Sequence, residues 1–404
     1  MANLSSTATA PQSVSFKSEN EFGKKYALTI LTSLFFSWGF LTCLNDILIP
    51  HLKAFFTLSY AQAVLVQFVF FSSYLLVSIP ASWFCEKVGY SRGMSIGLVV
   101  AAAGAFGFLA AAEYQMYSIF LGSLFVLASG ITLLQVAANP YVTLIGDPAK
   151  ASSRLTWAGA FNSLGTTVAP IVGSVMILSS MEVTTVQKPY FILGCTLVLL
   201  SVVMAWLKLP EIKTGSKAEV TLWKDMLTQR ELMLGALGIF TYVGAEVSIG
   251  SFLVSWLGEG SVGAMIPEQA GKYVAFYWGG AMVGRFIGTP LLAKYAVNKV
   301  SRLFVAGALL CVVVSALTQG WVSVVAILSV GLFNSILFPV IFAETLNRVK
   351  RGTERASGVL CSAIIGGALI PVVQGLVADG FSLRVSFVTP LICYLYLIWF
   401  VGRS

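Results

Sequence analysis

The stretch NPYVTLIGDPAKASSRLTWAGAFNSLGTTVAPIVG (residues 139–173) has a counterpart in the second half of the chain, FPVIFAETLNRVKRGTERASGVLCSAIIGGALIPVVQG (residues 338–375). In each stretch a proline in an apolar segment is followed by a basic loop and then by an arginine that begins the next apolar segment. The spacing from this arginine to a second proline is 16 residues in both stretches, from Arg154 to Pro170 and from Arg355 to Pro371. The equal spacing predicts that the chain consists of two halves with the same architecture.

The composition indicates a membrane protein rather than a soluble one. Of the 404 residues, 57% are hydrophobic and 10% are charged, whereas soluble domains contain about 25% charged residues. The apolar runs are long enough for membrane-spanning helices, and they lack the alternating pattern of outer-membrane barrel strands. We therefore expect an all-α integral membrane protein.

The reactive side chains are too few and too scattered for an enzyme. The chain has one histidine and six cysteines, and no two cysteines form a CxxC pair. We interpret the cysteines as small apolar residues, with no disulfide, metal site or catalytic cluster. The sequence has no GxxxxGK[ST] phosphate-binding loop, so this chain is not expected to hydrolyse ATP. No cofactor is expected apart from a co-transported ion.

Apolar windows of about twenty residues, the length that crosses a bilayer, occur twelve times along the chain. Twelve transmembrane helices divide into two pseudo-symmetric six-helix bundles if the halves match as the repeat indicates. We expect the spans at residues 26–50, 61–84, 93–112, 117–145, 154–179, 190–208, 231–257, 270–292, 303–319, 321–343, 355–378 and 385–402.

The basic residues assign the two sides of the membrane. With twelve spans and a cytoplasmic N-terminus, 21 of the 25 Lys and Arg residues fall on the cytoplasmic side, and Lys53, Lys188, Lys272 and Arg384 fall outside. This asymmetry is what the positive-inside rule requires. It also accounts for the sequence pI near 9.1 without a nucleic-acid partner.

The longest polar interruption separates the two halves. We expect a disordered cytoplasmic tail at residues 1–23, an N-terminal bundle at 24–208, a cytoplasmic linker at 209–230 and a C-terminal bundle at 231–404. Both termini then lie in the cytoplasm. We expect a monomer in the lipid bilayer, because no feature indicates an obligate oligomer.

Polar and aromatic side chains inside the spans should face a cavity or a partner helix. Amides both donate and accept hydrogen bonds, and aromatic rings offer flat apolar faces, so this set suits a neutral monosaccharide. An anionic substrate would need a basic residue in mid-span, and Arg285 is expected toward the cytoplasmic end of its span. The sugar-binding residues we expect are Trp38, Gln67, Gln135, Asn139, Asn162, Tyr242, Glu246, Trp278 and Asn334.

Several of these residues have a second interpretation. Gln67 and Asn334 could bridge neighbouring helices, and the two tryptophans could pack without touching a ligand. Glu246 could be a structural carboxylate of the C-terminal half. These alternatives stay open on the sequence alone.

Asp46 is the carboxylate whose position in an apolar span is hardest to explain without a function. It lies in GFLTCLNDILIPHL (residues 39–52), inside the first span, and an ionised carboxylate in hydrocarbon costs about 3 kcal/mol or more. Two interpretations fit: Asp46 takes up a proton from outside, or it stays ionised and binds Na⁺ with neutral oxygen ligands. The candidate oxygens belong to Thr42, Asn45, Gln135 and Asn139.

Five motifs resemble the fucose–galactose–glucose symporter family of the major facilitator superfamily. They are GFLTCLNDILIPHLK in span one, LLQVAANPYV in span four, FNSLGTTVAPIVG in span five, YVGAEVSIGSFL in span seven and LFNSILFP in span ten. The resemblance implies alternating access by rocking of two six-helix bundles around one central sugar site. It also implies ion-coupled uptake across a bacterial inner membrane, with glucose, galactose or a related hexose as the substrate.

The chain departs from the fucose branch of this family at one position. That branch has an embedded carboxylate in span one, which matches Asp46, and a second in span four, which falls on Gln135 here. Gln135 cannot titrate but can ligate a cation, so we favour Na⁺ over H⁺ as the coupled ion. The alternatives are an H⁺-coupled hexose or deoxyhexose symporter, or an uncoupled sugar facilitator.

Two basic segments, EKVGYSRG (residues 86–93) and AKYAVNKVSR (residues 293–302), occupy matching positions in the two halves. In the superfamily, such cytoplasmic loops carry charges that latch the halves together in the outward-open state. The alternative is plain anchoring by positive charge. The cytoplasmic gate residues we expect are Glu86, Lys87, Arg92 and Arg154 in the first half, with Arg285, Lys294, Arg302, Glu344 and Arg355 in the second.

Overall fold

The computed structural model describes residues 21–56, 60–176, 186–207, 209, 226–349 and 352–403, which are helices joined by short turns. The tail at residues 1–20 and most of the expected linker, residues 210–225, lie outside the described residues. The first helix begins at Glu21, so the expected tail is three residues too long at its boundary. Within the described ranges the chain contains no β-strand, as the sequence predicts.

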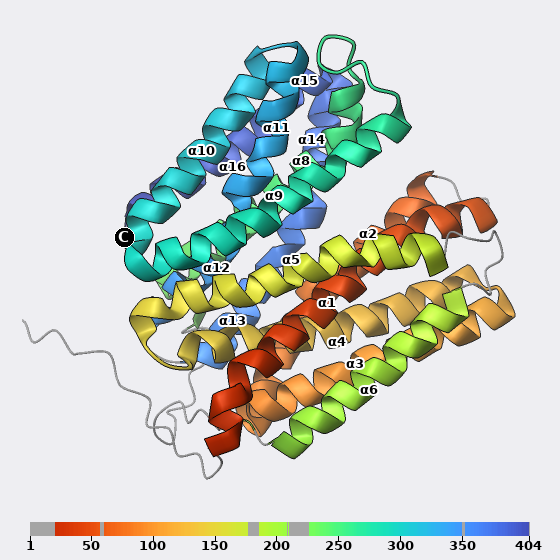
Figure 1. The fold of residues 1–404 in the computed structure, drawn as a ribbon, viewed down its shortest axis with the longest axis vertical. Helices are drawn as coiled ribbons and strands as arrows, with labels where there is room; N and C mark the ends of the chain where they lie inside the picture. Colours follow the sequence, from red (N-terminus) through yellow and green to blue (C-terminus); the bar gives the residue numbers. More distant parts are fainter. Residues whose placement is uncertain are drawn as a thin grey trace, which may run out of the picture.

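The N-terminal half contributes six long helices (Figure 1). Each covers one expected span, with ends that differ by a few residues. A single 3₁₀ turn, Pro148–Lys150, joins the fourth helix to the fifth. The helices are α1 Glu21–Phe55, α2 Tyr60–Val88, α3 Tyr90–Tyr114, α4 Tyr117–Leu144, α5 Ala151–Met176 and α6 Gln187–Leu207.

The C-terminal half contains three unbroken helices followed by three spans that are interrupted. The interruptions divide the expected spans at 321–343, 355–378 and 385–402 into shorter helices, with the 3₁₀ turn Ala363–Ile365 inside the second. The helices are α8 Arg230–Gly258, α9 Pro267–Lys294, α10 Val297–Leu317, α11 Gly320–Asn334, α12 Leu337–Arg348, α13 Thr353–Ser362, α14 Gly366–Gly380, α15 Leu383–Ser386 and α16 Val388–Gly402.

Proline explains two of these interruptions. A proline has no N–H to bond the carbonyl four residues earlier, and its ring clashes with that carbonyl. Pro339 therefore releases the carbonyl of Ser335, which lies between α11 and α12. Pro390 releases the carbonyl of Ser386, where α15 ends.

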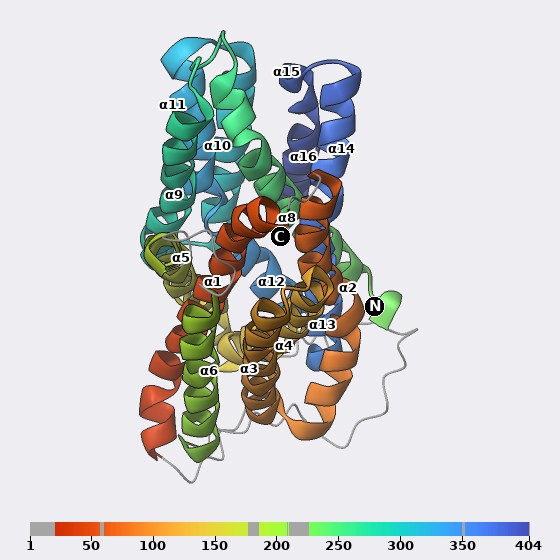
Figure 2. The same ribbon diagram turned by 90° about the vertical axis from the view of Figure 1, so that its right-hand side faces the viewer.

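The helices form two bundles, α1–α6 and α8–α16, which lie against each other with their helices inclined to one another (Figures 1 and 2). Ten of the described helical segments are long and apolar enough to cross a membrane. The other two expected spans are α5 and α9, which are more polar and pack against each other where the bundles meet. With these two, the described chain forms the twelve-helix architecture that the sequence predicts.

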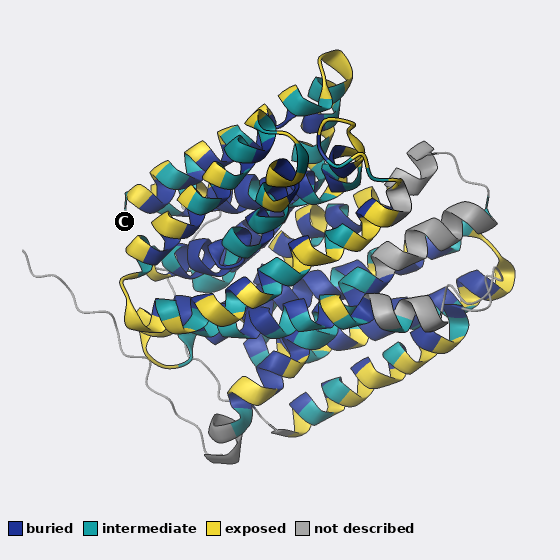
Figure 3. Ribbon diagram, turned by 45° about the horizontal axis from the view of Figure 1, so that its top comes forward, coloured by how far each residue is buried: buried dark blue, intermediate teal, exposed yellow. Residues whose placement is uncertain are grey.

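Small residues let helices approach closely within each bundle. Between α3 and α4, a methyl group on Gly104 would collide with the backbone of Leu127, and one on Gly97 would lie 3.0 Å from the carbonyl oxygen of Gly130. Such close contacts supply the dispersion energy that holds helices together in lipid. The outer faces carry exposed apolar side chains, such as Trp206 and Leu310 (Figure 3), as expected for a surface in contact with lipid.

Candidate functional site

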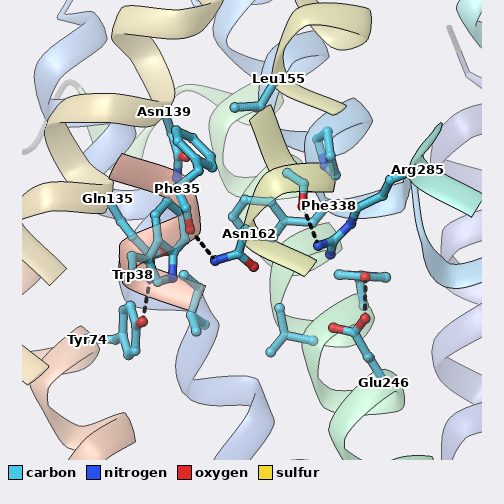
Figure 4. Close-up of a pocket in the computed structure, with 15 residues that line it drawn as sticks. Phe35, Trp38, Tyr74, Gln135, Asn139, Leu155, Asn162, Glu246, Arg285 and Phe338 are labelled. Carbon is cyan, nitrogen blue, oxygen red and sulfur yellow. Dashed lines mark hydrogen bonds between the residues drawn. The ribbon is translucent and has the colours of Figure 1, made fainter. Parts of the chain in front are cut away.

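A cavity of about 160 Å³ lies between the two bundles (Figure 4). Both halves contribute to its wall, with residues from α1, α2, α4 and α5 on one side and from α8, α9 and the α11–α14 region on the other. Its small volume suits a monosaccharide-sized molecule better than a drug-sized one, for which pockets of about 300 Å³ or more are usual. The lining residues are Phe35, Trp38, Tyr74, Gln135, Asn139, Leu155, Gly159, Asn162, Tyr242, Val243, Glu246, Arg285, Phe338, Pro339 and Ile364.

The N-terminal wall presents three amide side chains. The Gln135 amide donates a hydrogen bond to the Tyr74 hydroxyl, and the Asn162 amide donates to the Phe35 carbonyl oxygen at 3.1 Å. These bonds fix two of the three amides, and they use the amide N–H groups rather than the amide oxygens. Trp38 lies beside them, tilted against Phe35 with ring centroids 4.6 Å apart.

Asn139 is the amide with unused bonding capacity. It is fully buried on α4, and neither its nitrogen nor its oxygen has a hydrogen-bond partner among the described nitrogen and oxygen atoms. The weakly bonding thiol of Cys361 lies within reach. A buried group left without a partner costs about 1–3 kcal/mol. A ligand with hydroxyl groups in the cavity would recover that energy.

The C-terminal wall carries a carboxylate held by tyrosines. The Tyr242 hydroxyl donates to the Glu246 carboxylate at 2.8 Å, and the Tyr277 hydroxyl donates to the Glu246 backbone carbonyl at 3.0 Å. Behind this wall, the Asn334 amide donates to Tyr277 at 3.2 Å and accepts from Tyr394 at 2.7 Å. Asn334 thus bridges α9, α11 and α16 and lies outside the cavity lining, which favours the helix-bridging alternative over a role as a sugar ligand.

Arg285, which the sequence predicted as a gate residue, is also part of the cavity wall. It lines the cavity and bonds across the halves, donating to the Gly159 carbonyl at 2.9 Å and to the Ser163 hydroxyl on α5. Its Nε donates at 3.1 Å to the Ser335 carbonyl that Pro339 releases from the helix. Arg285 lies in the second half of α9 (Pro267–Lys294), toward the end predicted to be cytoplasmic, and the cavity extends to this level of the helix.

Two expected sugar ligands lie outside the cavity. Gln67 is exposed on α2, two helical turns (about 10 Å) before Tyr74 toward the predicted outer end. Trp278 is 38% exposed and packs edge-on against Tyr277, with ring centroids 5.1 Å apart. Helical spacing placed Gln67 correctly on the face of Tyr74, but spacing carries no information on how far the cavity extends along that face.

The apolar part of the cavity was missed by the sequence analysis. Phe35, Leu155, Val243, Phe338 and Ile364 line it together with the polar residues. Apolar residues are so common in these spans that their type gives no signal. Only the i, i+3 relation of Phe35 to Trp38 could have indicated a shared helix face.

The expected cation ligands are only partly described. The backbone of α1 continues through Asn45 and Asp46, but their side chains are outside the described part of the structure. Thr42 is half-buried, and its hydroxyl donates to the Trp38 carbonyl at 3.0 Å within its own helix. Asp46 lies eight residues after Trp38, which is about 12 Å further along α1. Its coupling role therefore stays a prediction.

An ion pair joins the halves at the end of the bundle that is predicted to be cytoplasmic. The Arg355 guanidinium, 7% exposed on α13, bonds the Glu86 carboxylate of α2 through Nε at 2.9 Å and Nη2 at 3.2 Å. Three more hydrogen bonds cross between the halves toward the same end. They join Ser152 to the Glu344 carboxylate at 3.3 Å, Ser153 to the Thr289 carbonyl at 2.8 Å and Ser357 to the Val136 carbonyl at 2.8 Å.

Arg154 makes its described bonds inside one half. It donates to the carbonyl oxygens of Val142 at 3.2 Å, Thr143 at 2.8 Å and Asp147 at 2.7 Å. These bonds satisfy the last carbonyls of α4 and the turn that follows, which is what a basic residue does at a helix C-terminus. The structure thus gives Arg154 a capping role where the sequence predicted a latch, and it places Arg92 on the exposed face of α3.

Comparison with protein families identifies the architecture. Residues 30–363 match the Major Facilitator Superfamily. The chain belongs to the major facilitator superfamily. This superfamily groups membrane transporters rather than enzymes, and the named relatives below agree with that.

Curated relatives place this superfamily member in the fucose–galactose–glucose symporter branch. It is 46% identical to a glucose/galactose transporter of Brucella abortus biovar 1, over 95% of this chain and 94% of the relative. It is 42% identical to a putative glucose/galactose transporter of Helicobacter pylori J99, over 94% and 96%. It is 31% identical to the L-fucose-proton symporter of Escherichia coli K12, over 90% of both chains.

Solved structures of the superfamily agree with the fold. The crystal structure of the transporter FucP in an outward conformation superposes with a TM-score of 0.88 at 30% identity, covering 95% of this chain and 99% of that one. The proton:xylose symporter XylE, at 12% identity and a TM-score of 0.74, shares the fold alone. This superfamily member is closed at the end that holds the Glu86–Arg355 pair, because the two halves are in contact there.

Proposed function

We propose that the chain imports glucose, galactose or a closely related hexose across a bacterial inner membrane, together with a cation, by alternating access. The observation that carries the proposal is the cavity between the halves, lined by the buried amide of Asn139, which has no partner among the described nitrogen and oxygen atoms. The Brucella and Helicobacter relatives, named as glucose/galactose transporters, supply the substrate class.

The cavity combines groups that suit a neutral, hydroxyl-rich molecule. Amides and the Tyr242–Glu246 pair can accept from and donate to sugar hydroxyls, and Phe35, Trp38 and Phe338 offer apolar faces. Arg285 and Glu246 place one positive and one negative group in the wall, so the lining favours neither an anionic nor a cationic substrate. We therefore propose that the sugar binds uncharged, between the two bundles.

The ion pair and hydrogen bonds between the halves support alternating access. With the Glu86–Arg355 pair closed, the cavity is sealed from the predicted cytoplasmic side, and sugar reaches it from the opposite side. Release requires that this pair separate and that the Arg285 bonds to α5 rearrange. Sugar binding can shift this equilibrium only by binding one conformation more tightly than the other.

The coupling cation is proposed to act at Asp46. Na⁺ is the candidate that the sequence favours, since Gln135 stands where the fucose branch has a second carboxylate. The Escherichia coli relative is an L-fucose-proton symporter, which favours H⁺ as the second candidate. A cation couples to the sugar if its occupancy of Asp46 changes the sugar affinity or the rate of switching, and the coupling is reciprocal.

Gradient-driven uptake of radiolabelled glucose into proteoliposomes tests the proposal. An inward Na⁺ gradient and an inward H⁺ gradient are imposed separately, with unlabelled galactose and a deoxyhexose as competitors. Accumulation above the external concentration under one gradient identifies that cation. Equilibration without accumulation under both gradients would show that the protein is a facilitator rather than a symporter. Lack of any sugar uptake would overturn the proposed substrate class.

A further inference from the structure

A second cavity lies within the N-terminal half, apart from the central one. It has a volume of about 670 Å³, and its walls come from α1, α5 and α6. α1 and α5 pack closely along their length, whereas α6 packs on α3 and touches α1 and α5 only sparsely. The result is a groove between α6 and the α1–α5 pair that opens on the outer face of the bundle, where Leu28 and Leu199 are 40% and 64% exposed.

The groove occupies one leaflet of the membrane. Its residues are 28–37 on α1, 157 and 161 on α5, and 196–203 on α6. These are the early turns of α1 and α5 and the late turns of α6, so all three walls lie at the end predicted to be cytoplasmic. The α1 wall is about 13 Å long, close to half of the roughly 30 Å hydrocarbon thickness.

Five hydroxyl side chains line the groove, and four of them, all but Thr29, donate their hydrogens inside their own helices. Thr32 and Ser33 donate to the Thr29 carbonyl at 2.8 and 3.0 Å, and Ser37 donates to the Ser33 carbonyl at 2.9 Å. On the facing helix, Thr196 donates to the Ile192 carbonyl at 2.8 Å. The groove therefore presents mainly methyl groups and aromatic rings to an occupant, which suits hydrocarbon rather than a sugar.

We propose that this groove binds an acyl chain of a phospholipid from the leaflet that is predicted to be cytoplasmic. The position, length and apolar lining of the groove match the tail region of that leaflet. A second copy of the chain is a poorer occupant, because its flat helix faces would have to enter a slot between helices of one bundle.

The bound chain would touch a helix that takes part in transport. Trp157 and Phe161 form the α5 wall of the groove, and their rings also meet Phe286 of α9 in the other half, with centroids 5.9 and 6.5 Å away. α5 also holds Arg285 of α9, which donates to the Gly159 carbonyl and the Ser163 hydroxyl. An acyl chain in the groove packs against Trp157 and Phe161 next to their contact with Phe286, so its presence alters the rate at which the halves separate.

Photolabelling of the full chain in proteoliposomes tests this binding. The probe is phosphatidylethanolamine with a diazirine on one acyl chain, and the readout is the labelled peptides after irradiation. We expect labelling of residues 28–37 and 196–203 to exceed, several-fold, that of the lipid-exposed face of α10 around Leu303 and Leu310. Equal labelling of all exposed faces, or crosslinks between two copies at the groove, would overturn the proposal.

Groove-filling variants separate binding in the groove from contact with bulk lipid. Ser33→Trp and, on the opposite wall, Thr196→Trp should each lower the groove labelling several-fold and change the initial rate of sugar uptake. Ser329→Trp is the matched control, because its hydroxyl makes the same bond to the carbonyl four residues earlier on α11. Unchanged labelling in both groove variants rejects the site, and lost labelling with a wild-type uptake rate rejects the link to α5.

Discussion

Two buried asparagines show how the same residue type serves two purposes in this chain. Asn139 lines the central cavity and has no partner among the described nitrogen and oxygen atoms. Asn334 is equally buried, but both ends of its amide bond tyrosines away from the cavity. The sequence analysis assigned both to the sugar, because spacing along a helix does not show which neighbours are within reach.

Replacing Asn139 by leucine should weaken sugar binding without weakening the fold. The change removes a buried amide that bonds no described nitrogen or oxygen atom, so the free energy of unfolding should stay the same or rise. It also removes at least one hydrogen bond to the sugar, worth about a tenfold loss of affinity. Isothermal titration with glucose and thermal unfolding of the purified protein measure the two effects.

The matched variant Asn334→Leu should show the reverse pattern. It leaves the Tyr394 hydroxyl without its acceptor, which costs about 1–3 kcal/mol for a buried group. It also removes the bond that the Tyr277 hydroxyl accepts, although Tyr277 still donates to the Glu246 carbonyl. We expect a lower unfolding temperature and a smaller change in sugar affinity than for Asn139→Leu. If Asn139→Leu binds glucose as the wild type does, Asn139 is not a sugar ligand.

At the scale of elements, the break between α11 and α12 connects helix geometry to the cavity. Pro339 leaves the Ser335 carbonyl without a helical partner, and Arg285 takes that carbonyl as an acceptor at 3.1 Å. The sequence predicts one continuous span at 321–343, although Pro339 is visible in it. Proline marks a possible break, but many spans absorb one, as α2 does at Pro80.

Replacing Pro339 by alanine should let the helix close over the break. The alanine supplies an N–H that competes with Arg285 for the Ser335 carbonyl, so Arg285 loses one of its anchors and sugar affinity falls. Hydrogen exchange at residues 336–340 should slow as the helix becomes continuous. Pro80→Ala, within an unbroken helix, is the control; equal effects of both changes on sugar affinity would refute the link between this break and the cavity.

At the scale of the whole molecule, the twelve-helix architecture could be read from the sequence because it rests on length, hydropathy and the sidedness of basic residues. Each of these properties accumulates over many residues, so single errors cancel. The cavity wall depends instead on which helices meet and at what depth, as the presence of Arg285 in that wall shows. The repeat did align Arg154 with Arg355, yet one caps a helix and the other joins the halves.

The Glu86–Arg355 pair should hold the halves together at the predicted cytoplasmic end. Changing Glu86 to glutamine removes the charge that pairs with the nearly buried guanidinium, a loss of about 1–3 kcal/mol from this closed conformation only. Distances between spin labels on α2 and α13 should then shift toward longer values. The charge exchange Glu86→Arg with Arg355→Glu should restore part of the closed population.

Arg154→Gln provides the comparison for that experiment. Arg154 occupies the position in the N-terminal half that matches Arg355. The change removes its bonds, which all stay within that half. We expect it to destabilise the end of α4 and to leave the spin-label distances between halves unchanged. Opening of the molecule by Arg154→Gln but not by Glu86→Gln would show that the latch had been assigned to the wrong pair.

The measurement that tests the central claim most directly compares two transport modes in wild type and Asp46→Asn. Proteoliposomes are assayed for glucose accumulation under a cation gradient and for exchange of labelled glucose at equilibrium. We predict that the wild type accumulates glucose, and that Asp46→Asn exchanges it but no longer accumulates it, because the coupling cation has lost its carboxylate. Accumulation by Asp46→Asn at the wild-type level would contradict cation coupling at this residue.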